Sequence, residues 1–82
     1  MTLKIISPQE ILYEGEVSMV NLPGEMGAFT VLKNHASLIS SLTPGKVGYR
    51  RSDSQENSEP EEIMISGGIA VVDNNVISVC VN

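Results

Sequence analysis

The chain has 82 residues, a length that allows one domain, which we place at residues 1–82. Ten acidic residues against five basic ones give a formal net charge of −5. This balance argues against nucleic acid or an anionic lipid surface as the main target, because both attract clustered lysine and arginine. A single cysteine excludes an internal disulfide, and one cysteine with one histidine is too few for a closed zinc site. So small a domain needs a further source of stability, so we expect a protein partner.

The chain has no sequence signal for a membrane or for secretion. No apolar window reaches the ~18 residues that a membrane helix requires. The first residues lack the apolar core and the cleavage site of a secretory signal. An unpaired cysteine fits a reducing compartment. We therefore expect the chain to serve a membrane only indirectly, through a partner.

Alternating apolar and β-branched residues predict strands from the start of the chain. Residues 2–7 begin the first strand, which the following proline stops because proline has no N–H to donate. Residues 12–21 form a longer strand, in which Val17, Met19 and Asn21 are expected to share one side.

The middle of the chain predicts a meander of short strands joined by turns. Residues 27–32 form a strand, and residues 33–35 reverse its direction. Residues 36–42 run back and end at Thr43-Pro44-Gly45, a sequence typical of turns. Residues 46–51 continue the meander.

The last third of the chain predicts a loop and three more strands. Residues 52–62 contain no apolar side chain and are expected to form a mobile hairpin loop. Strands are predicted at residues 63–66, 68–73 and 76–81. Asn74-Asn75 separates the last two, and asparagine tolerates the left-handed backbone of a tight hairpin. These patterns predict an all-β fold, a small flattened β-sandwich or barrel of about 8–10 short, mostly antiparallel strands.

The last three strands are nearly continuous apolar runs, whereas a strand with one wet face should alternate. Two interpretations remain open. Either both faces are internal to a tightly closed barrel, or one face is an exposed apolar surface that a protein partner covers.

Single residues that could carry chemistry are isolated from one another. Glu25 lies in a glycine-flanked loop, where a lone acid is ordinarily solvated or contacts a protein. General acid–base catalysis by it would need a second titratable partner. His35 has serines nearby at positions 37, 40 and 41, but no acid is placed to orient its imidazole as a catalytic triad requires.

Two further features have structural explanations. Gly67-Gly68 fits neither common phosphate-loop pattern and predicts a bulge or close backbone packing. Cys80 lies among apolar residues and is expected to be buried. The sequence shows no catalytic constellation, and we expect no catalysis, cofactor or metal.

The order and spacing of several motifs resemble the epsilon subunit of the rotary F-type ATP synthase. The resemblance covers essentially the whole chain. The matching residues are Pro23-Gly24-Glu25, Gly27, Phe29, Val31-Leu32, Asn34-His35-Ala36, Leu38, Leu42, Pro44-Gly45, Ser66-Gly67-Gly68 and Val72.

The resemblance implies a non-catalytic subunit of the central stalk. It implies that the chain binds the gamma subunit and the polar loops of the c-ring, coupling proton translocation to rotary ATP synthesis. It also implies a peripheral location on the cytoplasmic face of a bacterial inner membrane. The positions that match the family's ring-facing loops are Gly24, Glu25, Met26, Gly27 and His35.

Two departures from the family pattern are evident. Ser37 stands where the motif usually has proline, and the chain ends at Asn82, where family members commonly continue into two helices. The chain is therefore expected not to inhibit ATP hydrolysis through those helices. Two other functions stay open: a stand-alone β-sandwich adaptor for another protein, and a small hydrolase that uses His35 and a nearby serine.

Overall fold

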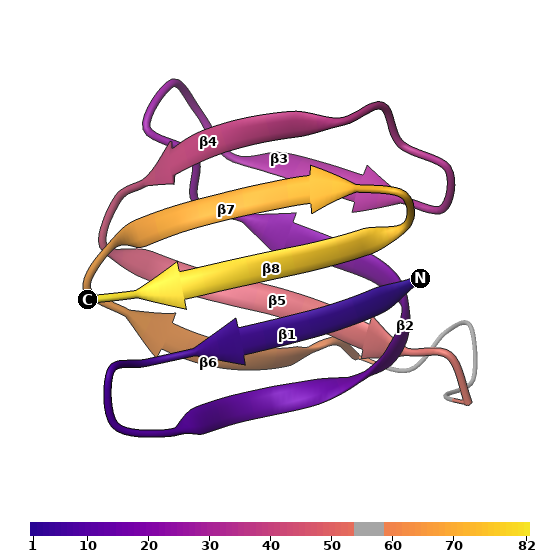
Figure 1. Ribbon diagram of the computed structural model, residues 1–82, viewed down its shortest axis with the longest axis horizontal. Coiled ribbons are helices and arrows are strands. Elements are labelled where there is room, and N and C mark those ends of the chain that lie inside the picture. Colours follow the sequence, from indigo (N-terminus) through magenta and orange to yellow (C-terminus); the bar gives the residue numbers. More distant parts are fainter. Residues whose placement is uncertain (54–58) are drawn as a thin grey trace.

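The computed structural model describes residues 1–53 and 59–82, and these form an all-β structure (Figure 1). Eight strands lie within the described residues. Their bounds are β1 (Thr2–Ile6), β2 (Ile11–Leu22), β3 (Phe29–Leu32), β4 (Leu38–Leu42), β5 (Gly45–Arg51), β6 (Glu61–Ile65), β7 (Gly68–Asp73) and β8 (Val76–Val81).

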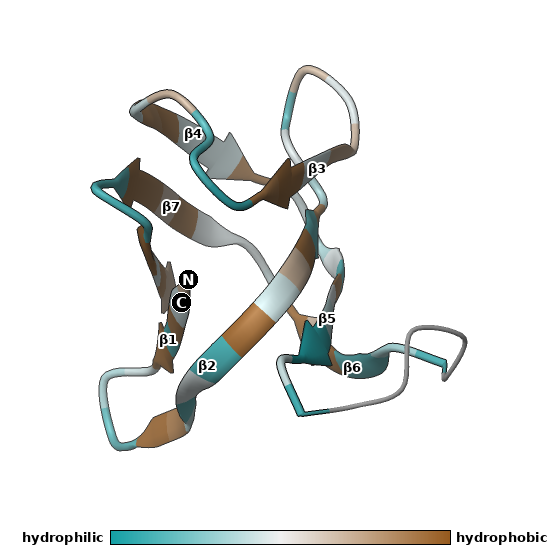
Figure 2. Ribbon diagram, turned by 90° about the vertical axis from the view of Figure 1, so that its right-hand side faces the viewer, coloured by the Kyte–Doolittle hydropathy of each residue, from teal (hydrophilic) through white to brown (hydrophobic). Residues whose placement is uncertain are grey.

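The strands form one continuous sheet that curls over itself into a sandwich. Its order is β4-β7-β8-β1-β2-β5-β6, and β3 pairs with β2. All pairings among these strands are antiparallel except that of β1 with β8, which is parallel. Figure 2 shows β2 running diagonally between the two layers. Its first half pairs with β1 in one layer and its second half with β3 and β5 in the other.

The two layers enclose a single apolar core. Along most strands buried and exposed residues alternate, as expected where one face of a sheet is covered. Leu3 and Ile5 of β1 and Ile77 and Val79 of β8 are fully buried, so the central pair of strands anchors the core. The other core residues are Val17, Val20, Leu22, Val31, Leu42, Val47, Tyr49, Ile65, Ala70, Val72 and Val81.

The predicted all-β sandwich is confirmed, but the predicted meander in the middle of the chain is wrong. β3 and β4 do not pair with each other: β3 pairs with β2, and β4 pairs with β7. The connection between them crosses from one layer to the other. Turn signals in a sequence show that the chain changes direction, but they do not show which strand the chain meets afterwards.

The predicted orientation of β2 is also wrong in its second half. The pairing of β2 with β5 shifts register between Val17 and Met19. This irregularity changes the alternation, so that Val20 and Leu22 follow Val17 into the core while Asn21 is exposed.

The turns near the C-terminus agree with the sequence analysis. Asn74 and Asn75 have φ angles of 49° and 61° and form the tight hairpin between β7 and β8. Gly67 and Gly68 have φ angles of 130° and 153°, and the backbone of the next strand packs closely against Gly68. The predicted mobile loop at 52–62 falls partly on residues 54–58, outside the described residues. β6 begins at Glu61, earlier than predicted.

Replacing Gly68 with alanine should cost at least about 3 kcal/mol of unfolding free energy, because strain and overlap add. An added Cβ would lie 2.1 Å from the carbonyl oxygen of Cys80. Gly27→Ala is the matched control, since Gly27 also has a positive φ but no atom within 4 Å of an added Cβ. It should cost about 1–2 kcal/mol, from backbone strain alone. Urea denaturation measures both, and equal losses would contradict the close packing at Gly68.

Candidate protein-interface site

The loop between β2 and β3 presents an acid and a methionine on a braced backbone. The N–H of Gly27 donates to the carbonyl of Gly24 (3.0 Å), and the N–H of Glu25 donates to the carbonyl of Ser41 on β4 (2.9 Å). Gly24 is required here because an added Cβ would lie 2.7 Å from the carbonyl oxygen of Gly27. Glu25 is exposed, and Met26 is 100% exposed. The loop therefore displays two side chains from a fixed position.

The second predicted site residue, His35, lies in the connection between β3 and β4. Asn34 adopts a φ of 65°, and the N–H of His35 donates to the carbonyl of Leu32 (3.2 Å). His35 is exposed, with its Nδ1 2.8 Å from the carbonyl oxygen of Ala36. Among the described residues the His35 ring contacts its own neighbour Ala36, so the imidazole is available to another molecule.

The two predicted regions lie on the same edge of the sandwich, formed by β3 and β4, which we call the β3–β4 margin. They lie at opposite ends of this margin. The loop of residues 24–27 precedes β3 and contacts the end of β4, whereas His35 follows β3 and precedes β4. Figures 1 and 2 show both connections on the side of the molecule formed by β3 and β4. The four residues of β3 lie between them, and this strand alone is roughly 13 Å long at about 3.3 Å per residue. A partner that touches both must cover the whole margin.

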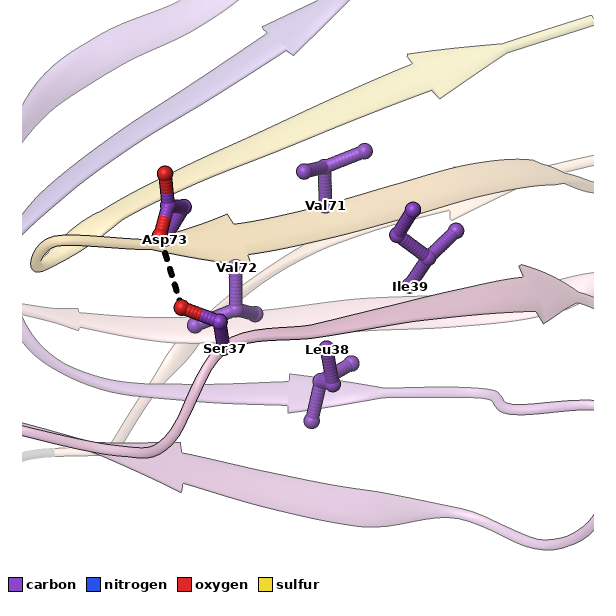
Figure 3. A pocket seen from close by; sticks show the side chains of 6 residues that line it. All are labelled: Ser37, Leu38, Ile39, Val71, Val72 and Asp73. Atoms are coloured by element: carbon purple, nitrogen blue, oxygen red, sulfur yellow. Dashed lines mark hydrogen bonds between the residues drawn. The ribbon is translucent and has the colours of Figure 1, made fainter.

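Sequence reasoning did not assign individual residues of a second surface, the outer face of β4, β7 and β8. We define this outer apolar face by Ile39, Ile69, Val71, Val76 and Cys80. Strand pairing places Ile39 opposite Val71 and Ile69 opposite Cys80. In the shallow pocket of Figure 3, Ile39 and Val71 lie on one side of β4 and β7, and Leu38 and Val72 on the other. The alternative of a barrel with both faces internal is therefore wrong.

The prediction that Cys80 is buried is also wrong, because the thiol is exposed. Ile77, Val79 and Val81 of β8 point into the core. Residues between them must face outward, whatever their hydropathy, because successive side chains of a strand alternate. Apolar neighbours in the sequence therefore did not indicate burial.

At the end of β2 that is remote from β3, aromatic and charged side chains contact one another. Tyr13 and Tyr49 stack with their ring centroids 4.3 Å apart, and the guanidinium of Arg51 lies 5.6 Å from the Tyr13 ring centroid. Arg51 forms a two-pronged ion pair with Glu61, and this pair raises the pKa of Arg51. Burial, with a further contribution from Glu61, raises the pKa of Tyr49. These contacts join β2, β5 and β6 and do not form a reactive centre.

Within residues 1–53 and 59–82, the groups expected for catalysis or metal binding do not come together. No three His, Cys, Asp or Glu side chains there could hold a metal ion. The hydroxyl of Ser37 donates to Asp73, and that of Ser40 donates to the carbonyl of Ser41, so neither is hydrogen-bonded to His35. Among the described residues no hydrogen bond joins a serine hydroxyl to the His35 ring, so the hydrolase interpretation has no nucleophile–base pair to support it. None of the described residues forms a helix long and apolar enough to cross a membrane.

Comparison with known proteins gives the family. The sequence model for the beta-sandwich domain of the ATP synthase delta/epsilon chain matches residues 1–82. The chain belongs to this family. The ATP synthase epsilon chain of Campylobacter lari is 43% identical over 79 residues, and that of Chlorobaculum tepidum is 40% identical over 74 residues. The resemblance inferred from the motifs is confirmed.

Coverage of the relatives differs. The match with the Campylobacter lari protein covers 96% of this chain and 58% of the relative, and the match with the Chlorobaculum tepidum protein covers 90% and 80%. The chain thus spans little more than half the length of the Campylobacter protein.

Solved structures share the fold of this domain. A chain from the central stalk and c-ring structure of the Tetrahymena thermophila mitochondrial ATP synthase has a TM-score of 0.78 at 16% identity, covering 99% of this chain and 62% of its own. A chain from the Euglena gracilis mitochondrial ATP synthase has a TM-score of 0.82 at 22% identity, covering 96% and 48%. At these identities the likeness shows the fold alone.

The pairing of Thr2 with Glu16 generates a pH-dependence prediction. The Thr2 hydroxyl donates to the Glu16 carboxylate and, with the nearby N-terminal ammonium, lowers the pKa of Glu16. A lowered folded pKa stabilises the fold above the unfolded value, near 4.5, and this stabilisation is lost as the pH falls through the folded value. Thr2→Val should therefore destabilise the protein near neutral pH, and the difference from wild type should shrink in acid.

Urea denaturation from pH 7 to pH 3, with an NMR titration of the Glu16 carboxyl, measures this effect. The Glu16 titration midpoint should rise in the variant. A stability difference that stays constant across this pH range would contradict the assignment.

Proposed function

We propose that this chain is the β-sandwich part of a central-stalk subunit of an F-type ATP synthase. It binds the gamma subunit and the polar loops of the c-ring, and so couples proton translocation to rotary ATP synthesis. The observation that carries the proposal is the family match over residues 1–82. The role is mechanical and non-catalytic. The bacterial relatives support a peripheral location on the cytoplasmic face of the inner membrane.

The β3–β4 margin suits the contact with the ring. Gly24, Glu25, Met26, Gly27 and His35 lie there; Gly24 is buried beneath the loop, whereas the side chains of Glu25, Met26 and His35 are exposed. The carboxylate of Glu25 favours basic or hydrogen-bond-donating groups, which a polar loop supplies. The hydrogen bond from the Glu25 N–H to β4 ties the loop to the sheet. A braced loop loses little conformational freedom on binding, so contacts made through it are strong for their size.

The outer apolar face suits the contact with gamma. Ile39 is 75% exposed, and Ile69, Val71 and Val76 are each more than a third exposed. Several apolar side chains gathered on one sheet face are typical of a protein interface. Because β4 belongs both to this face and to the β3–β4 margin, a single strand would connect the gamma contact with the c-ring contact.

Charge reversal at the β3–β4 margin tests the proposed contact with the c-ring. Glu25→Arg combined with His35→Ala should weaken binding to the purified c-ring roughly tenfold, as expected when central contacts of an interface are lost. Glu10→Arg makes the same charge change at an exposed position in the β1–β2 loop, away from this margin, and should leave ring binding unchanged. Binding is measured by titrating the chain against detergent-solubilised c-ring.

Two outcomes would count against the ring contact. Equal effects of the Glu25 and Glu10 variants would show that net charge, and not this loop, governs binding. A chain that captures neither the ring nor gamma would favour the alternative of a stand-alone adaptor for another protein.

Cys80 offers a direct test of the gamma contact. In the free chain its exposed thiol should react with maleimide nearly as fast as in urea. Saturating gamma should slow the reaction roughly tenfold or more, because the partner covers the outer apolar face. A Cys80→Ser/Gln9→Cys variant, with its thiol in the exposed β1–β2 loop, is the matched control and should react equally fast with or without gamma. Unprotected Cys80 in a demonstrated gamma complex would place the interface elsewhere.

A further inference from the structure

The connection between β3 and β4 that carries His35 is held by residues some 40 positions later in the chain. β3 and β4 lie in different layers and do not pair, so this connection is not held as the turn of a two-stranded hairpin would be. The contacts that fix it come instead from the hairpin between β7 and β8, and they are made by Asp73 and Asn75. This arrangement puts two distant turns side by side.

The first contact is a reciprocal pairing of two asparagines. The side-chain oxygen of Asn75 accepts the backbone N–H of Asn34 (2.6 Å), while the Asn75 amide nitrogen donates to the side-chain oxygen of Asn34 (2.9 Å). Both residues have positive φ, at 65° and 61°, a conformation that asparagine tolerates. Two hydrogen bonds from one amide fix both the distance and the orientation of the turn.

The second contact lies on the other side of His35. The Ser37 hydroxyl donates to the Asp73 carboxylate (2.6 Å), as the dashed line in Figure 3 shows. A hydrogen bond to a carboxylate is stronger than one between neutral groups. Asn34 and Ser37 flank His35, so the segment that carries the imidazole is hydrogen-bonded to the β7–β8 hairpin on both sides of His35.

We propose that Asn75 and Asp73 are positioning residues that preform the His35 turn for its partner. This inference rests on the proposed contact of that turn with the c-ring. Neither residue needs to touch the ring; each acts by holding Asn34 or Ser37 in place. A turn held in its bound shape before association loses less entropy on binding, so removing either contact weakens the ring complex.

The hairpin supplies a matched pair of variants. Asn74 and Asn75 are adjacent, and both have positive φ, so glycine keeps the turn conformation at either position. The hydrogen bonds described for the His35 connection come from Asn75 and not from Asn74. Asn75→Gly should weaken c-ring binding about three- to tenfold, whereas Asn74→Gly should leave it unchanged.

Ser37 supplies a second pair with a conservative rescue. Ser37→Ala removes the hydroxyl that Asp73 accepts and should weaken ring binding, while Ser37→Thr keeps a hydroxyl and should restore it. Gamma binding and Tm are measured in parallel, and gamma binding should be the same in Asn75→Gly and Asn74→Gly. A loss confined to ring binding distinguishes positioning from general destabilisation. If Asn75→Gly lowers Tm more than Asn74→Gly does, the comparison of Ser37→Ala with Ser37→Thr decides between positioning and general destabilisation.

Each outcome gives a clear answer. Ring binding lost in Asn75→Gly and Ser37→Ala, but kept in Asn74→Gly and Ser37→Thr, supports the inference. Ring binding that His35→Ala weakens but Asn75→Gly and Ser37→Ala do not would overturn it and leave the proposed function intact. A wild-type chain that shows no saturable binding to the c-ring would overturn both.

Discussion

The structure depends on the change of register within β2. A strand of twelve residues would continue in one sheet if its alternation were regular, but between Val17 and Met19 the pairing shifts. The strand can then pair with β1 at one end and with β3 and β5 at the other. This lets a single curled sheet cover its own apolar face, so that a short chain encloses a core without a disulfide.

The sequence predicted local features well and long-range ones poorly. The strands and the Asn74-Asn75 turn follow from propensity and backbone sterics, which act within a few residues. The partners of β3 and β4 could not be read in this way, because pairing depends on where the layers meet. The prediction that Cys80 is buried was wrong because hydropathy alone does not show which residues of a strand face the core.

In the candidate site, too, local features follow from the sequence and long-range contacts do not. The glycine-flanked acid and His35 were indicated by the family motif, and in the structure both side chains are exposed. That the two stand at opposite ends of one margin, and that Asn75 holds the turn of His35, depends on contacts between segments far apart in the sequence. No pattern within the turn itself indicates such a contact.

The parallel pairing of β1 with β8 has a consequence for how the protein folds. Leu3 and Ile5 lie beside residues near the end of the chain, so the middle of the sheet joins its first and last strands. Such distant contacts make folding slow, because a long loop must close before they form. During synthesis β1 can pair early with β2, but its pairing with β8 must wait until nearly all of these residues have left the ribosome. In this interval the domain is most exposed to aggregation.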